Sequence, residues 1–180
     1  MRYRGGMDGA PNLLFGDEAA AALQLLHEAA FAYLAMVEPQ GPYVLPLNFV
    51  YVDGSGGAAA TLAAGSLTGR IYFHTGEGRK TAALAADPRV CLAVTAGAAF
   101  QQGDNPCADG FSYRSLLLWG QARAMDDPAE REAALRAILA KYDPGAATKP
   151  FGAALFARTM LFEMTIEAAS YKQEPAGAGG

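Results

Sequence analysis

The fold of this chain is decided by Pro42-Tyr43-Val44-Leu45-Pro46-Leu47-Asn48-Phe49-Val50-Tyr51-Val52 and, further along, by Gly69-Arg70-Ile71-Tyr72-Phe73-His74-Thr75. Both stretches are rich in β-branched and aromatic residues, which predicts a strand in each. Pro46 has no N–H to donate to a ladder, so it is predicted to lie at an edge, at a bulge or at an interruption that faces a ligand. The Gly- and Ala-rich segment 53–68 is predicted to be a long hairpin loop with an inserted piece.

The turn after the second stretch concentrates positive charge. Glu77-Gly78-Arg79-Lys80 follows the strand end at His74 and opens a helix predicted over residues 79–86. Cations at a helix N-terminus are unfavourable because the macrodipole is positive there. A bound anion, most naturally a phosphate, would explain them, and a solvated basic turn is the alternative.

The rest of the chain is predicted to alternate strands with peripheral helices. One helix is expected from an Asp17 cap to about Glu28, and another from Asp127-Pro128 to Tyr142, with an apolar stripe at Leu135, Ile138, Leu139 and Tyr142. Further strands are expected at 31–37, 89–95, 111–125 and 158–168, and 97–110 is expected to be irregular. Several connections are too short for parallel crossovers, which favours a mainly β fold, an antiparallel barrel or sheet.

Composition bounds the size and class of the protein. The 180 residues, 52% hydrophobic and 18% charged, fit a single domain. We expect that domain at 15–172, between a flexible arm at 1–14 and a disordered tail at 173–180. A net charge of −4 lacks the basic excess of nucleic-acid-binding proteins. With no signal-peptide pattern and no long apolar run, we expect a cytoplasmic protein that does not contact a membrane.

Several chemistries leave no motif in the sequence. The two histidines and two cysteines lack metal-ligand spacing, so no metal site is predicted. Neither GxSxG nor GxGxxG occurs. Cys91 is expected in the core, and Cys107 in a loop.

Together these stretches resemble the FMN-binding split barrels related to pyridoxamine 5′-phosphate oxidase, and within them the nitroimidazole-resistance (Nim-like) branch. The resemblance extends over about residues 20–172 and includes Asp87 to Cys91, Tyr113 to Ser115, Leu118 to Arg123 and Lys141-Tyr142. It implies a six-stranded antiparallel split β-barrel. It also implies a homodimer with two flavin sites at the interface.

The resemblance assigns roles to individual residues. Arg79 and Lys80 would hold the FMN phosphate, which agrees with the argument from the helix terminus. The other implied cofactor contacts are Pro46, Leu47, Asn48 and Phe49 along the isoalloxazine ring, His74 and Thr75 beside the ribityl-phosphate chain or the ring, and Ser115 on the later long strand.

Two residues are candidates for the chemistry itself. His74 would donate to a flavin or substrate oxygen, or protonate a reduced product, and a satisfied structural histidine is the alternative. Tyr113 is the candidate for the substrate side. Trp119 is expected in the core or at a dimer interface.

We therefore expect an FMN-dependent oxidoreductase acting on a small nitro- or quinone-type molecule, with a nicotinamide donor as a candidate. The chain ends in Tyr171-Lys172-Gln173-Glu174 and a Gly/Ala tail, without the arginine-containing motif of pyridoxamine phosphate oxidases, so vitamin B6 oxidation is not expected. The alternatives are a deazaflavin-binding barrel, a haem-binding barrel with His74 as iron ligand, a flavin-binding module without turnover, and a dimeric interaction module.

Overall fold

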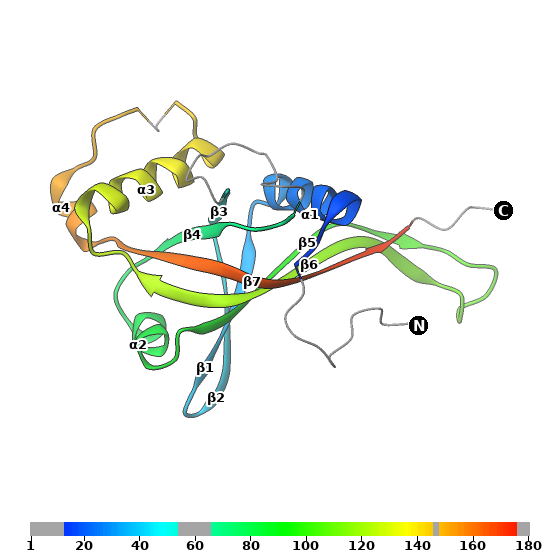
Figure 1. The fold of residues 1–180 in the computed structure, drawn as a ribbon. Coiled ribbons are helices and arrows are strands. Elements are labelled where there is room, and N and C mark those ends of the chain that lie inside the picture. Colours follow the sequence, from blue (N-terminus) through cyan, green and yellow to red (C-terminus); the bar gives the residue numbers. More distant parts are fainter. Residues whose placement is uncertain (1–12, 54–65, 146–147, 176–180) are drawn as a thin grey trace.

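The computed structural model describes residues 13–53, 66–145 and 148–175, which form one strongly curved antiparallel sheet with helices around it (Figure 1). The strand order is β2-β1-β5-β6-β7-β4-β3. The strands are β1 (Ala32–Glu38), β2 (Gly41–Leu47), β3 (Phe49–Val52), β4 (Arg70–Thr75), β5 (Arg89–Gln101), β6 (Gly110–Ala124) and β7 (Met160–Glu174). The helices are α1 (Gly16–Glu28), α2 (Arg79–Ala86), α3 (Pro128–Tyr142) and α4 (Ala153–Arg158).

The sheet opens at Asn48, the one residue between its two edge strands. On one side of it Leu47 of β2 lies opposite Ala32, and on the other Phe49 of β3 lies opposite Phe73. A continuous segment therefore leaves one edge of the sheet and joins the other, which is how a split barrel curls without closing. The expected mainly β, antiparallel split barrel is confirmed, but the described residues hold seven strands where six were expected, because residues 42–52 form two.

The position of Pro46 agrees with its chemistry. It lies on β2, an edge strand, opposite Tyr33 of β1. A proline on an edge costs the sheet no ladder bond when its nitrogen faces outward. Of the three positions predicted for Pro46, the structure shows the edge.

The core fills the inside of the curved sheet. Alternate residues of β1, β4, β5 and β6 point inward, and α1 lays its buried face, which includes Ala22 and Leu26, across them. Phe73 and Phe162 stack on neighbouring strands with ring centroids 5.4 Å apart. A smaller cluster, which includes Val50, Ile138 and Leu161, holds α3 against the opposite side of β3 and β7.

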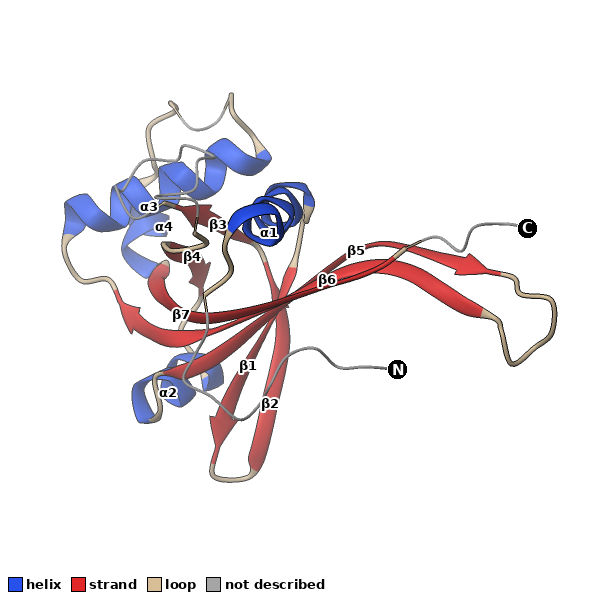
Figure 2. Ribbon diagram, turned by 45° about the vertical axis from the view of Figure 1, so that its right-hand side comes forward, coloured by secondary structure: helices blue, strands red, loops and turns tan. Residues whose placement is uncertain are grey.

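Strands β5, β6 and β7 run further than expected. Residues 97–101, expected to be irregular, extend β5, and β7 continues through Gln173 and Glu174 into the expected tail. β5 and β6 project together beyond the body as a long hairpin, which Figure 2 shows clearly. Phe100 and Phe111 pack edge to face on it, with centroids 5.5 Å apart. The expectation failed because the small residues 96–98 give little strand signal, whereas pairing resumes beyond them at Ala99, Phe100 and Gln101.

The two long helices form where the sequence predicts them, but the cap of α1 and the buried positions of α3 differ from the prediction. α1 is capped by Phe15 and not by Asp17, which lies in the first turn, where its charge suits the helix dipole. On α3 the fully buried positions are Ala134 and Ile138, whereas Tyr142 is 38% exposed. The expected stripe omitted alanine, which fits where the helix approaches the sheet most closely. Arg158, expected to begin a strand, ends the short helix α4.

The Asp127 cap forms as predicted and should be measurable. Its carboxylate accepts from the backbone N–H of Ala129 at 3.0 Å and of Glu130 at 2.9 Å. We expect Asp127→Ala to lower the free energy of unfolding by about 1 kcal/mol, because those two amides lose their acceptor. Urea denaturation would measure it, and Asp126→Ala, one residue outside the cap, is the control that should change little.

Parts of the sequence expectations concern residues outside the described ranges. These are most of the arm at 1–14, residues 54–65 of the predicted hairpin loop, and the end of the tail from 176. Leu14, at the described end of the arm, is buried in the core. No helix in the described residues is long and apolar enough to span a membrane.

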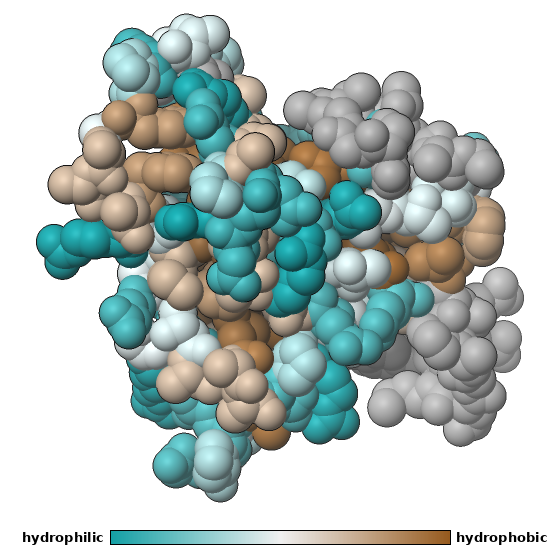
Figure 3. All heavy atoms as spheres, turned by 60° about the vertical axis from the view of Figure 1, so that its left-hand side comes forward, coloured by the Kyte–Doolittle hydropathy of each residue, from teal (hydrophilic) through white to brown (hydrophobic). Residues whose placement is uncertain are grey.

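The convex face of the sheet exposes large apolar side chains. We call this the outer sheet face and define it by Tyr33 and Val37 of β1, Val44 of β2, and Leu117 and Trp119 of β6, all 37–55% exposed. The strand registers align them, since Val44, Ala35, Cys91 and Trp119 follow one another across four strands. Hydrophobic side chains also reach the surface among polar ones on the face drawn in Figure 3. Apolar patches of this kind commonly mark contact sites.

Candidate functional site

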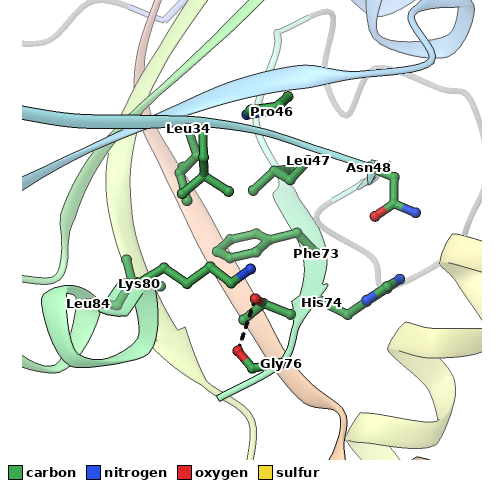
Figure 4. A pocket seen from close by; sticks show the side chains of 11 residues that line it. Leu34, Pro46, Leu47, Asn48, Phe73, His74, Gly76, Lys80 and Leu84 are labelled. Atoms are coloured by element: carbon green, nitrogen blue, oxygen red, sulfur yellow. Dashed lines mark hydrogen bonds between the residues drawn. The ribbon is translucent and has the colours of Figure 1, made fainter. Parts of the chain in front are cut away.

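A pocket of about 300 Å³ lies where the sheet splits (Figure 4). Its walls come from β1, β2, the Asn48 crossover, β4 with the turn after it, and α2. The lining residues are Leu34, Leu45, Pro46, Leu47, Asn48, Phe73, His74, Thr75, Gly76, Lys80 and Leu84. Part of the lining is apolar, and Asn48, His74, Thr75 and Lys80 add polar groups to it. An apolar pocket with a few polar groups is typical of small-molecule sites.

Lys80 brings the positive charge of this pocket. It is the second residue of α2, and Figure 4 shows its side chain reaching across the pocket toward Phe73. The N-cap of α2 is Gly78, which has no side chain to satisfy the first helical amides; its own N–H donates to Thr81 Oγ1 at 3.1 Å. A flexible ammonium group and the positive end of a helix therefore face the same space, an arrangement that suits an anion.

His74 lies at the end of β4 and is neutral at pH 7. Burial lowers its pKa below the ordinary 6.5, and the positive charge of Lys80 lowers it further. The neutral imidazole can donate from one nitrogen and accept at the other. The next residue, Thr75, ends β4, and its Oγ1 donates to the carbonyl of Gly76 at 3.1 Å.

The pKa of His74 predicts a pH dependence with a definite sign. Because its folded pKa lies below the unfolded value of 6.5, its contribution to stability is complete above pH 6.5 and is lost as pH falls through the folded pKa. We expect wild type to lose more unfolding free energy than His74→Gln between pH 7.5 and 5.

NMR titration of the His74 imidazole should show its pKa rising in Lys80→Ala, because the positive charge of Lys80 is removed. An unchanged pKa would contradict the proximity of the two groups.

Arg79 does not line the pocket. Its guanidinium binds both carboxylate oxygens of Glu38, with Nη2–Oε2 at 2.5 Å and Nε–Oε1 at 2.9 Å, and lies 4.4 Å from the centre of the Tyr43 ring. Only 7% of the Glu38 side chain is exposed, whereas 65% of the Arg79 side chain is exposed, so the ion pair lies at the surface. The bidentate geometry occupies the guanidinium with this carboxylate. In this structure Arg79 joins α2 to the β1–β2 hairpin, and Lys80 alone of the two cations reaches the pocket.

Three other expected site residues also lie outside the pocket wall. Phe49 is fully buried, and its ring faces the core. Tyr113 and Ser115 lie on β6, opposite Glu174 and Lys172 of β7, and the Tyr113 hydroxyl accepts from Lys172 Nζ at 2.7 Å. Six of the expected residues do come together: Pro46, Leu47, Asn48, His74, Thr75 and Lys80.

The apolar side of the pocket was not predicted. Leu34, Leu45 and Phe73 come from three strands, and only their pairing brings them together. Leu84 carried a usable signal, since it lies four residues after Lys80 on the same face of α2. No group of three or more His, Cys, Asp or Glu residues gathers to hold a metal ion in the part of the chain described.

Comparison with known families decides the relationship. The family model described as pyridoxamine 5′-phosphate oxidase matches residues 18–173. The chain belongs to this pyridoxamine 5′-phosphate oxidase-like family. The resemblance seen in the sequence is thereby confirmed, and the match runs from α1 to the penultimate residue of β7. No curated protein matches the chain.

Solved structures of the same fold include flavin- and haem-binding proteins. An FAD- and haem-binding protein from Mycobacterium smegmatis aligns with a TM-score of 0.73 and 22% identity, over 93% of this chain and 76% of that one. The flavocytochrome Anf3 from Azotobacter vinelandii aligns with a TM-score of 0.71 and 22% identity, over 91% and 70%. A proposed 5-nitroimidazole antibiotic resistance protein from Bacteroides thetaiotaomicron aligns with a TM-score of 0.66 and 18% identity, over 92% and 94%. At these identities the likeness concerns the fold.

Proposed function

We propose that this protein is an FMN-dependent oxidoreductase that acts on a small nitro- or quinone-type acceptor. The observation that carries the proposal is the pocket at the split of the sheet, where Lys80 at the start of α2 faces the crossover residues Pro46, Leu47 and Asn48. Bound flavin would supply the electron transfer, and the protein would supply anchoring and orientation.

The residues present fit this cofactor. Lys80 and the first amides of α2 would hold the phosphate. The edge strand at Pro46 and the Asn48 side chain would face the ring and its polar groups, and His74 would donate to the flavin or to a bound substrate. As a neutral imidazole it can donate a hydrogen bond without adding a second positive charge beside Lys80.

A second copy of the chain would complete the site. The cavity volume of about 300 Å³ is at the lower end of the range for ligand sites, about 300–1,000 Å³, and a flavin nucleotide is a large ligand. Pro46, at the rim of the pocket, shares a register row with Tyr33, Ala93 and Leu117 of the outer sheet face. A homodimer formed through this face would bury its apolar side chains, and Ser115 and Tyr113 on the same face of β6 would reach the site from the partner.

The first experiment is the visible absorption spectrum of the freshly purified protein, followed by release of any chromophore and mass spectrometry. We expect the two-band spectrum of an oxidised flavin and the mass of FMN. The bound flavin should be reduced by a nicotinamide donor and reoxidised by an added nitro or quinone acceptor. A single intense haem band, a deazaflavin mass, or a colourless protein that fails to bind added FMN would contradict the proposal.

A further inference from the structure

Tyr142, the last residue of α3, bridges the opening of the sheet. Its hydroxyl accepts from the backbone N–H of Phe49 at 2.9 Å. Its one hydrogen has two carbonyl oxygens within reach as acceptors, Ala30 O at 2.9 Å and Phe49 O at 3.0 Å. Ala30 precedes β1, and Phe49 begins β3. One side-chain oxygen therefore meets both backbone groups of Phe49 on the side where a neighbouring strand would otherwise pair.

Lys141, the residue before Tyr142, contacts the aromatic ring of Phe49. Its ammonium group lies 3.6 Å from the centre of the Phe49 ring and donates to the carbonyl of Leu26, in the last turn of α1, at 2.9 Å. Burial lowers the pKa of Lys141 to about 8. A half-buried lysine that lies over an aromatic ring and donates to one carbonyl restricts the motion of the groups that it contacts.

The residue held by these contacts is the neighbour of Asn48. Asn48 has no strand of its own, since it lies between β2 and β3, yet it and Leu47 form the crossover wall of the pocket. α3 contributes no lining residue to the pocket. Its C-terminal pair nevertheless fixes Phe49, and through the backbone the adjoining Asn48.

We propose that Tyr142, assisted by Lys141, is a positioning residue that sets the Asn48 wall of the pocket by closing the split between β3 and the start of β1. The ligand-binding part of this inference rests on the proposed function. The geometric part does not, because the crossover is held whether or not a flavin binds.

The test compares two conservative hydroxyl deletions. Tyr142→Phe removes only the bridging oxygen. Tyr51→Phe is the matched control, since Tyr51 also lies on β3 and its hydroxyl donates to a backbone carbonyl, that of Thr68, at 2.5 Å, away from the pocket. Affinity for FMN is measured by quenching of flavin fluorescence. In the protein without added flavin, NMR measures amide exchange at Asn48 and Val50, which flank Phe49 and whose amides Tyr142 does not touch.

We expect Tyr142→Phe to weaken FMN binding about tenfold, whereas Tyr51→Phe should keep the FMN affinity within about twofold of wild type. Amide exchange at Asn48 and Val50 should accelerate more in Tyr142→Phe than in Tyr51→Phe. Equal weakening in the two variants, or wild-type affinity in a folded Tyr142→Phe, would overturn the proposal. If wild type binds no FMN, the proposed function fails, but the exchange rates still test the positioning role of Tyr142. Faster exchange at Asn48 and Val50 in Tyr142→Phe alone supports that role, and unchanged exchange overturns it.

Discussion

Replacing Lys80 by alanine is expected to weaken FMN binding about 10- to 100-fold and to leave riboflavin binding unchanged. Lys80 lines the pocket at the first turn of α2, where a phosphate would meet its ammonium group and the helix amides. A hydrogen bond to a charged group contributes about 1.5–3 kcal/mol, and each 1.4 kcal/mol is tenfold in affinity. Riboflavin lacks the phosphate, so comparing the two ligands by fluorescence titration isolates this contact.

Two further variants make the Lys80 result specific. Lys80→Arg keeps the charge and should retain most of the FMN affinity. Arg79→Ala should cost less FMN affinity than Lys80→Ala, because Arg79 binds Glu38 and not the pocket. The resemblance in the sequence implied an equal role for the two cations. Equal losses of FMN affinity in Arg79→Ala and Lys80→Ala would support that equal role. Unchanged FMN affinity in Lys80→Ala would show that the phosphate does not bind at this end of the pocket.

Replacing Leu117 by glutamate is expected to convert the proposed dimer to a monomer and to abolish flavin binding with it. Leu117 lies in the middle of the outer sheet face, beside Ala93 of β5 and Ser170 of β7. Burying a carboxylate among apolar side chains costs several kcal/mol, which raises the dimer dissociation constant by about 100-fold or more. Light scattering would show the mass falling from twice the chain mass of 18.8 kDa to that mass itself.

The chain provides a matched control for this variant. Leu155 on α4 is 75% exposed and lies outside the sheet, so Leu155→Glu makes the same chemical change away from the outer sheet face. It should keep both the mass and the flavin. If Leu117→Glu remains a dimer and still binds flavin, the partner does not dock on this face. If it becomes a monomer that still binds flavin, the pocket of a single chain is sufficient.

Local chemistry made several features predictable. The α3 cap needed only Asp127, Pro128 and Glu130 in order, since capping depends on residues within one turn. The missing N–H of Pro46 limited it to an edge, a bulge or an interruption facing a ligand. The strand, the glycine turn and the helix after it indicated a cationic turn that would suit an anion, but not which of Arg79 and Lys80 would line a pocket.

Other features could not be read from neighbours along the chain. Residues 42–52 form one uninterrupted β-pattern, and only the pairing of Leu47 with β1 and of Phe49 with β4 divides them at Asn48. Arg79 and Lys80 are adjacent and chemically alike in the sequence. Their separation depends on Glu38, which lies 41 residues earlier and becomes a partner only when the β1–β2 hairpin packs against α2.

By itself, then, the sequence determined the strand-rich character, the positions of most elements and the family to which the chain belongs. The first two rest on residue types and short spacings, and the family rests on the resemblance of several motifs, which the family model confirms. Tertiary structure alone decided where the sheet splits, which cation enters the pocket and that Tyr142 bridges the opening. The reason is that these depend on contacts between residues far apart in the chain, such as Phe49 with Tyr142. The packing of α3 against β3 and β7 brings Tyr142 to Phe49, and no preference of the residues within any one of these elements specifies that packing.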